Sequence, residues 1–251
     1  MTLPARNIVV IGDSIAAGYG LPRAYAWPQL LIQQLSVQHP QFRWQLYNES
    51  IPGDATPDAY VRFDAVRRRR PHLAIFALGI NDCRRAESPV VARRIEHFRY
   101  NEQTWWGGNP LLRRIGYRLM QAKPSASPNP AISSQTPLED FVAILGWMVT
   151  QMQDADALPA LMALSPLAPQ LARSPDFAHC QRYNQAIRDI ARETGAAFIP
   201  THFPNDSGVW QVDGVHLSVL GQAQLAQCVL DSFLQPPIAS HLGLEAPAAH
   251  V

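Results

Sequence analysis

Residues 7–20, NIVVIGDSIAAGYG, change character within three positions of the chain. Residues 7–11 are mostly β-branched and apolar, which is typical of a buried strand, and Gly12, Asp13 and Ser14 then introduce a bend. A serine directly after a strand either caps the backbone that follows or presents its hydroxyl as a nucleophile. Which of these two roles Ser14 has depends on whether the rest of the chain supplies a base and the other groups that a nucleophile needs.

Short apolar runs alternate with longer amphipathic segments along the chain. This alternation predicts βαβ units, and therefore a three-layer α/β/α sandwich around a five-stranded parallel sheet. In such open sheets, ligands bind beyond the carboxyl ends of the strands. The predicted strands are 7–11, 43–48, 73–78, 160–164 and 196–199, and the predicted helices are 25–38, 57–68, 138–153, 178–193 and 218–234.

The segments that lack this alternation of strands and helices indicate the domain organisation. We expect one domain at 1–238, with an insertion at about 84–137 after the third strand and a C-terminal tail at 239–251. The insertion exceeds usual loop lengths, so it should contain its own helices or act as a lid. Its stretch TWWGGNPLLRRIGYRLM makes Trp105 and Trp106 candidates for a substrate rim, against the alternative of an amphipathic helix that packs on its own domain.

Composition excludes several classes of function. The 251-residue chain has a net charge of +1, which gives no overall field to attract nucleic acid or an anionic membrane. The arginine run at 67–70 reads as a solvated helix end, no segment has the length of a membrane span, and no metal-ligand spacing is present. The three widely separated cysteines (Cys83, Cys180 and Cys228) suggest reduced thiols, and with the absence of a signal-peptide pattern they predict a cytoplasmic protein.

Polar or glycine residues follow four of the predicted strands. Acyl transfer needs a nucleophile, a base, a group that orients the base, and donors for the oxyanion. We expect Ser14 as the nucleophile and His216 as the base. Asp213 is expected to orient His216, since the three residues of spacing between these two allow one tight turn to join them. The oxyanion donors would be the Asn81 amide and the backbone N–H groups of Gly53 and Ser14. Asp13 and Asp82 are expected to brace the loops that carry Ser14 and Asn81.

These motifs resemble the four blocks of the SGNH hydrolase superfamily, the GDSL esterases and lipases. The matching stretches are GDS at 12–14, NESIPGDAT around Gly53, GIND at 79–82 and DGVH at 213–216. The NESIPGDAT stretch is similar to the thioesterase/lysophospholipase and arylesterase branch. The resemblance implies a flavodoxin-like sandwich, no metal or cofactor, and hydrolysis of an ester or thioester through an acyl-serine. It thins out between residues 84 and 136, and GDSI replaces the commoner GDSL.

Several functions stay open at this point. A serine esterase or thioesterase comes first, and an acyltransferase or a carbohydrate O-deacetylase would use the same residues. A non-catalytic, flavodoxin-like binding module is disfavoured, because a binder needs no base oriented by a carboxylate. Ser14 does not lie in a G-x-S-x-G elbow, and neither a P-loop nor a G-x-G-x-x-G sequence follows the first strand, which disfavours an α/β-hydrolase and a nucleotide-binding protein. The sequence predicts a small-molecule ester or thioester as the partner and no nucleic acid, and it leaves the oligomeric state open.

Overall fold

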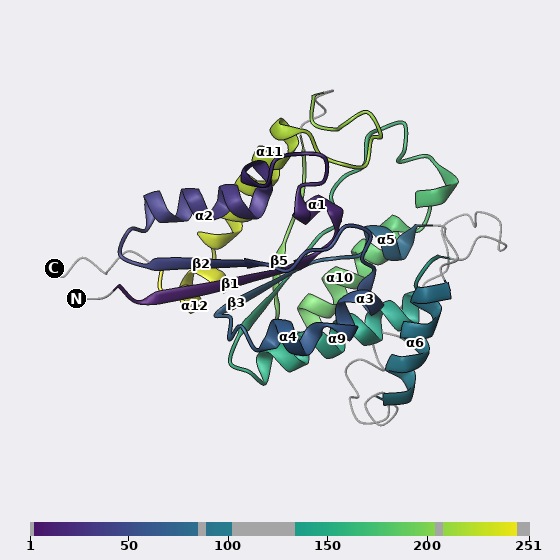
Figure 1. Ribbon diagram of the computed structural model, residues 1–251, viewed down its shortest axis with the longest axis horizontal. Coiled ribbons are helices and arrows are strands. Elements are labelled where there is room, and N and C mark those ends of the chain that lie inside the picture. The colour runs from purple at the N-terminus through teal and green to yellow at the C-terminus, as the bar shows by residue number, and fades with distance from the viewer. Residues whose placement is uncertain (1–2, 85–88, 102–133, 204–207, 245–251) are drawn as a thin grey trace.

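The computed structural model describes residues 3–84, 89–101, 134–203 and 208–244, and its centre is a five-stranded parallel sheet (Figure 1). The strand order is β2-β1-β3-β4-β5. This confirms the predicted α/β class and the flavodoxin-like topology. The strands are β1 (Ala5–Gly12), β2 (Arg43–Asn48), β3 (Leu73–Ala77), β4 (Leu158–Met162) and β5 (Ala197–Ile199).

β1 and β3 are neighbouring strands in the interior of the sheet, and their carboxyl ends define the edge at which a ligand site is expected. Both are apolar runs with buried residues on both faces, as expected of strands covered by helices on both sides. Their parallel register pairs Gly12 with Ala77, so both strands end at the same level. The chain runs outward from β1 to β2 and then returns across β1 to β3. Such a reversal of strand order leaves a crevice between the two strand ends, where ligands bind in open α/β sheets.

Helices cover both faces of the sheet and complete the three predicted layers. α2 and α11 pack together on one face, whereas α3, α9 and α10 lie on the other (Figure 1). In α2, Leu31 and Leu35 are spaced by four residues, which places both buried side chains on the same side of the helix. The longer helices are α2 (Trp27–Gln38), α6 (Pro89–Asn101), α9 (Leu138–Gln153), α10 (Cys180–Thr194) and α11 (Val219–Phe233); the shorter ones are α1 (Ser14–Ala17), η1 (Arg23–Tyr25), α3 (Thr56–Val61), α4 (Phe63–Arg67), α5 (Ile80–Cys83), η2 (Pro175–Phe177) and α12 (Ile238–Leu242).

The helix predicted at 57–68 is broken at Arg62. The backbone leaves helical geometry there, and α3 ends before it while α4 begins after it. The Arg62 guanidinium donates to the Asp54 carboxylate through both Nε (3.0 Å) and Nη2 (2.6 Å). This ion pair fixes Arg62 against the loop that follows β2, a contact that helical periodicity does not encode.

The predicted insertion begins with α6, which packs on α3. Val91 and Ile95 form a small buried cluster with Ala55, and the Phe98 ring lies edge-on to Tyr60 with centroids 5.0 Å apart. Arg94 also forms an ion pair with Asp58 of α3. The described part of the predicted insertion thus contains one helix, α6, which lies against the segment that follows Gly53. Trp105 and Trp106 lie outside the described residues.

The predicted tail begins too early. α12 crosses the predicted boundary between residues 238 and 239, and Ala239, Leu242 and Leu244 are buried. The Arg6 Nε donates to the Leu242 carbonyl over 2.8 Å, which joins this helix to the start of β1. The domain therefore extends at least to residue 244.

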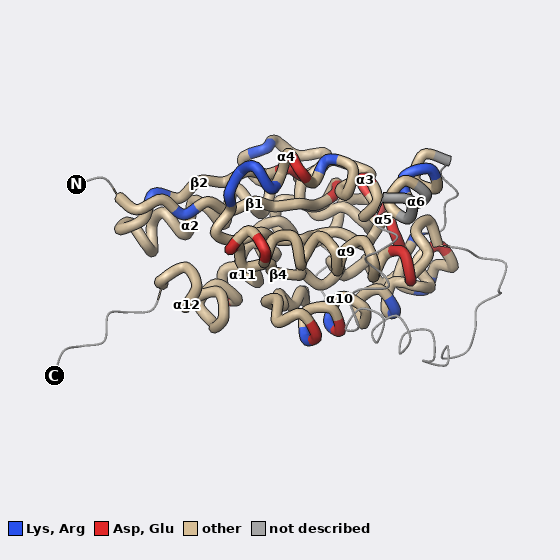
Figure 2. Tube along the Cα trace, turned by 90° about the horizontal axis from the view of Figure 1, so that it is seen from below, with Lys and Arg blue, Asp and Glu red and all other residues tan. Residues whose placement is uncertain are grey.

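The arginine run at 67–70 has acidic partners within the chain. Arg67 pairs with Asp64 (3.2 Å) and Arg69 with Glu49 (2.9 Å). Figure 2 shows acidic residues beside the basic ones around α4. These pairs favour the solvated-helix-end interpretation, and the expected lack of a nucleic-acid partner stays a prediction.

Candidate active site

Ser14 is the first residue of α1 and follows directly on β1. The N-cap of this short helix is Asp13, whose Oδ1 accepts a hydrogen bond from the Ile15 backbone N–H over 2.9 Å. Capping is therefore the role of Asp13, and the Ser14 hydroxyl is left for another partner. This answers the question raised by the sequence and confirms that Asp13 braces the bend.

That partner is His216, which comes from a loop 202 residues further along the chain. Ser14 Oγ donates to His216 Nε2 over 2.9 Å, and His216 Nδ1 donates to Asp213 Oδ2 over 2.5 Å. A ring that donates from Nδ1 has a lone pair on Nε2, so the geometry presents a base to the serine. The structure thus brings together the three residues predicted for the catalytic chain.

Asp213 is held by the turn that it begins. Its Oδ1 accepts from the backbone N–H groups of Val215 and His216, both over 2.9 Å. Desolvation by burial acts to raise the pKa of Asp213, but hydrogen bonds from the His216 side chain and from these two backbone groups outweigh it and lower the pKa. Asp213 is therefore ionised at neutral pH and can stabilise a protonated His216.

Gly53 and Asn81 are the other two predicted oxyanion residues, and their role as donors stays a prediction. Gly53 has φ = +88°, a conformation that strongly favours glycine. The Asn81 Nδ2 donates to the backbone carbonyl of Asp54 over 2.9 Å, which fixes the amide and leaves its second N–H for another acceptor. Both residues line the same cavity as Ser14 and His216.

This cavity, of about 580 Å³, has walls that sequence reasoning missed. Leu171 and Phe177 come from the segment after β4, the one predicted strand to which no functional residue was assigned. Tyr19 comes from the loop after α1, and Arg84 and Asp176 add one charge of each sign. No periodic pattern marks these residues in the sequence; the only signal was the long interval between β4 and α10.

Three buried acidic side chains support the loops of the site. Asp82 Oδ1 accepts from the Thr56 backbone N–H over 2.9 Å, which ties α5 to the start of α3 and agrees with its predicted bracing role. Burial raises the pKa of Asp82 to about 6 and that of Asp13 to about 7. Burial also raises the pKa of Asp54, against the opposing effect of its Arg62 partner.

Asp13→Asn is expected to flatten the pH dependence of stability. Burial raises the pKa of Asp13 to about 7, so the folded protein retains a proton that the unfolded chain releases near pH 4. The stability associated with this proton is complete below pH 4 and is lost as the pH rises through 7. The wild type should lose about 2 kcal/mol from this group between pH 5 and pH 8. Urea unfolding at both pH values, with wild type and variant, measures the difference.

Asp154→Asn is the matched control, because Asp154 is exposed at the end of α9. This variant should retain the wild-type difference between pH 5 and pH 8. An Asp13→Asn protein that loses as much stability as the wild type over this range would contradict the assignment.

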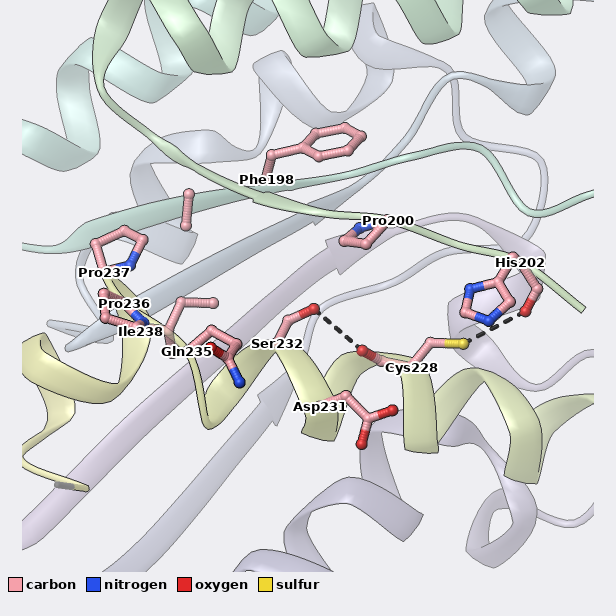
Figure 3. Close-up of a pocket in the computed structure, with 11 residues that line it drawn as sticks. Phe198, Pro200, His202, Cys228, Asp231, Ser232, Gln235, Pro236, Pro237 and Ile238 are labelled. Carbon is pink, nitrogen blue, oxygen red and sulfur yellow. Dashed lines mark hydrogen bonds between the residues drawn. The ribbon is translucent and has the colours of Figure 1, made fainter. Parts of the chain in front are cut away.

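A second pocket, of about 330 Å³, lies between β5 and the C-terminal half of α11 (Figure 3). The thiol and the hydroxyl group that line this pocket donate hydrogen bonds to backbone carbonyls. Cys228 Sγ donates to the His202 carbonyl over 3.4 Å, and Ser232 Oγ donates to the Cys228 carbonyl over 3.1 Å. The side chains that line this pocket therefore include no serine–histidine pair like that of Ser14 and His216.

The described residues show neither a metal-ligand cluster nor a membrane-spanning helix. Within them, no three His, Cys, Asp or Glu side chains form a group that could hold a metal ion. Among the helices placed by the structure, none combines the length and hydropathy needed to cross a bilayer.

Comparison with known proteins matches residues 10–224 to the model of the GDSL-like Lipase/Acylhydrolase family. An arylesterase of Vibrio mimicus is 35% identical over 88 residues, which cover 35% of this chain and 43% of that protein. Thioesterase 1/protease 1/lysophospholipase L1 of Escherichia coli K12 is 27% identical over 144 residues, which cover 55% of this chain and 67% of that protein. The match to the arylesterase thus spans less than half of its length.

Solved structures support the fold. The crystal structure of TesA superposes with a TM-score of 0.63 at 18% identity, covering 93% of this chain and 99% of that one. At this level of identity the likeness concerns the arrangement of the sheet and helices.

Proposed function

Since the chain belongs to the GDSL-like lipase/acylhydrolase family, we propose that it is a serine esterase that hydrolyses a carboxylic ester or thioester through an acyl-serine intermediate. One observation carries the proposal: Ser14 Oγ, the His216 imidazole and the Asp213 carboxylate form a continuous chain of hydrogen bonds of 2.9 and 2.5 Å. A nucleophile, a base and an orienting carboxylate in this order are the requirements of acyl transfer to serine.

The first half of the reaction forms the acyl-serine. Ser14 Oγ attacks the carbonyl carbon while His216 Nε2 takes the hydroxyl proton, and Asp213 stabilises the imidazolium that results. The negative charge on the carbonyl oxygen is met by the Asn81 amide and by the backbone N–H groups of Gly53 and Ser14. His216 then gives its proton to the departing alcohol or thiol as the tetrahedral intermediate collapses.

The second half releases the acid. Water donates a proton to His216 as it attacks the acyl-serine carbonyl, and the same donors receive the second oxyanion. Collapse breaks the bond between the carbonyl carbon and Ser14 Oγ, and His216 returns the proton to Ser14. The carboxylic acid leaves and the starting state is restored.

The cavity supports an acyl group of moderate size. Its volume of about 580 Å³ and the apolar walls from Tyr19, Leu171 and Phe177 suit an aliphatic or aromatic acyl group. The names of the two relatives, an arylesterase and a thioesterase, support esters and thioesters as the substrate class. A cytoplasmic location stays a prediction from the cysteine content.

A fluorophosphonate probe and a substrate panel test this function. The probe should label Ser14, located by peptide mapping, because only an activated serine attacks phosphorus. The panel consists of p-nitrophenyl acetate, p-nitrophenyl decanoate, decanoyl-CoA and an acetylated xylooligosaccharide, each with and without an added alcohol. We expect free acid as the main product of at least one ester or thioester.

Each alternative function gives a different result. Acylated alcohol as the main product would assign an acyltransferase, and turnover of the acetylated sugar alone would assign an O-deacetylase. A folded protein that neither reacts with the probe nor turns over any substrate would refute the enzyme and favour a binding module.

A further inference from the structure

The aromatic ring of Tyr19 lies over the imidazole of His216. The two ring centroids are 4.6 Å apart and the ring planes are inclined by 35°, which is a tilted stacking contact. Tyr19 also lines the cavity that contains Ser14, and 54% of its surface is exposed. No sequence motif assigns a role to Tyr19, but its ring contacts the predicted base inside the cavity of the site.

The backbone of Tyr19 is anchored to both catalytic loops. Its N–H donates to the Ser14 carbonyl over 2.9 Å, which fixes it to the nucleophile's helix. Its carbonyl accepts from Gln211 Nε2 over 2.8 Å, and the same nitrogen donates to the Leu217 carbonyl over 2.9 Å. Gln211 therefore links Tyr19 to the two ends of the loop that carries His216.

Gly20 makes this link sterically possible. It has φ = +78°, and a Cβ added there would lie 2.9 Å from Gln211 Oε1. A side chain at position 20 would thus press on the amide that joins the two loops. The backbone hydrogen bonds of Tyr19 and the left-handed conformation of Gly20 therefore hold the Tyr19 ring in its place over His216.

The stack restrains a motion that the catalytic hydrogen bonds leave free. The bonds to Ser14 and Asp213 hold the two ring nitrogens of His216, but the ring can still tilt about the line that joins them. Contact with the face of the imidazole opposes this tilt. In addition, the π-face of an aromatic ring attracts a cation, so the contact strengthens when His216 takes the proton from Ser14.

We propose that Tyr19 is a positioning residue for the base: its ring holds the His216 imidazole in line between Ser14 and Asp213 and stabilises the imidazolium formed during proton transfer. The inference rests on the proposed function, because it assumes that His216 acts as the base. Among the described residues, Ser14, Asp213 and Tyr19 contact the His216 ring, and Arg84 and Asp176 are the other charged residues that line the cavity.

The test uses a fluorophosphonate, because its reaction reports the first proton transfer without a known substrate. Ser14 Oγ forms a bond to phosphorus, fluoride leaves, and His216 takes the serine proton and passes it to water. The concentration dependence of labelling separates the maximal rate constant from the half-saturating probe concentration. Tyr19→Leu should lower the maximal rate constant roughly 2- to 30-fold, the range expected for a lost cation–π contact. The half-saturating concentration should change less.

Three further variants make the result specific. Tyr19→Phe keeps the ring and should retain at least half of the wild-type rate constant. Tyr19→Met, which is apolar but lacks a ring, should match Tyr19→Leu and replaces it if that variant fails to fold. Tyr25→Leu is the matched control, because Tyr25 is similarly exposed (44%) but does not line the cavity, and it should behave as the wild type.

The outcomes separate this inference from the proposed function. If the wild type is not labelled at Ser14, the proposed function fails and this inference fails with it. If the wild type is labelled and Tyr19→Leu and Tyr19→Met react at the same maximal rate, only the role of Tyr19 is overturned. The same holds if these variants change the half-saturating concentration alone, which would make Tyr19 a wall of the cavity, or if Tyr19→Phe is as slow as they are.

Discussion

Ser14→Ala is expected to lower kcat for p-nitrophenyl acetate by about 10⁶-fold, to the limit of detection. The hydroxyl that donates to His216 Nε2 over 2.9 Å is the atom that would form the acyl bond, and alanine offers no replacement. The side chain is small and its relative exposure is 8%, so its loss should leave the fold intact. Steady-state hydrolysis measures the effect, and thermal unfolding checks the fold.

Ser165→Ala is the matched control for this variant. Ser165 is also buried and follows β4 at the same edge of the sheet, but the structure gives its hydroxyl no hydrogen-bond partner among the described residues. This variant should retain near-normal turnover. A Ser14→Ala protein with more than about a tenth of the wild-type kcat would exclude Ser14 as the nucleophile.

Asp213→Asn is expected to lower kcat at pH 7 by about 10⁴-fold, with little change in fold. The carboxylate accepts the Nδ1 proton over 2.5 Å and so keeps the Nε2 lone pair directed at Ser14. An asparagine can donate its amide N–H to Nδ1, which places the ring proton on Nε2 and removes the base. Its remaining oxygen can still accept from Val215 and His216, so the turn should survive. Hydrolysis of p-nitrophenyl acetate under saturating substrate gives kcat.

Asp176→Asn distinguishes this effect from a general loss of negative charge in the cavity. Asp176 lines the same cavity as Asp213, whereas the hydrogen bonds of the His216 ring go to Asp213 and Ser14. Its substitution should change kcat by less than about threefold. If Asp213→Asn were no slower than Asp176→Asn, the orienting role of Asp213 would be refuted.

The catalytic residues could be predicted from the sequence because each is marked by its residue type and by its position relative to nearby residues. Asp213 and His216 lie three residues apart, and a single turn suffices to join them. Ser14 and Asn81 follow short apolar runs that are typical of buried strands, and parallel strands present their carboxyl ends at one edge of a sheet. Residue type, spacing and strand order therefore carry most of the information about the site.

Other features depend on contacts between distant segments. Arg62, at which the predicted helix breaks, forms an ion pair with Asp54 of the loop that follows β2. The cavity walls at Leu171 and Phe177 come from an irregular segment, and α12 continues the domain beyond its predicted end. Trp105 and Trp106, expected at the substrate rim, lie outside the described residues, so their role stays a prediction.

The sequence by itself predicted the five strands, the order of the motifs, and Ser14, His216 and Asp213 as nucleophile, base and orienting acid, since these predictions follow from side-chain type and short-range spacing. Only the tertiary structure decided that Ser14 and His216 meet across 202 residues and that Tyr19 covers the imidazole. It also decided that burial raises the pKa of Asp13 to about 7. The physical reason is common to all three: distance and desolvation depend on which segments pack around a group, and the reversal of strand order between β1 and β3 brings those segments together.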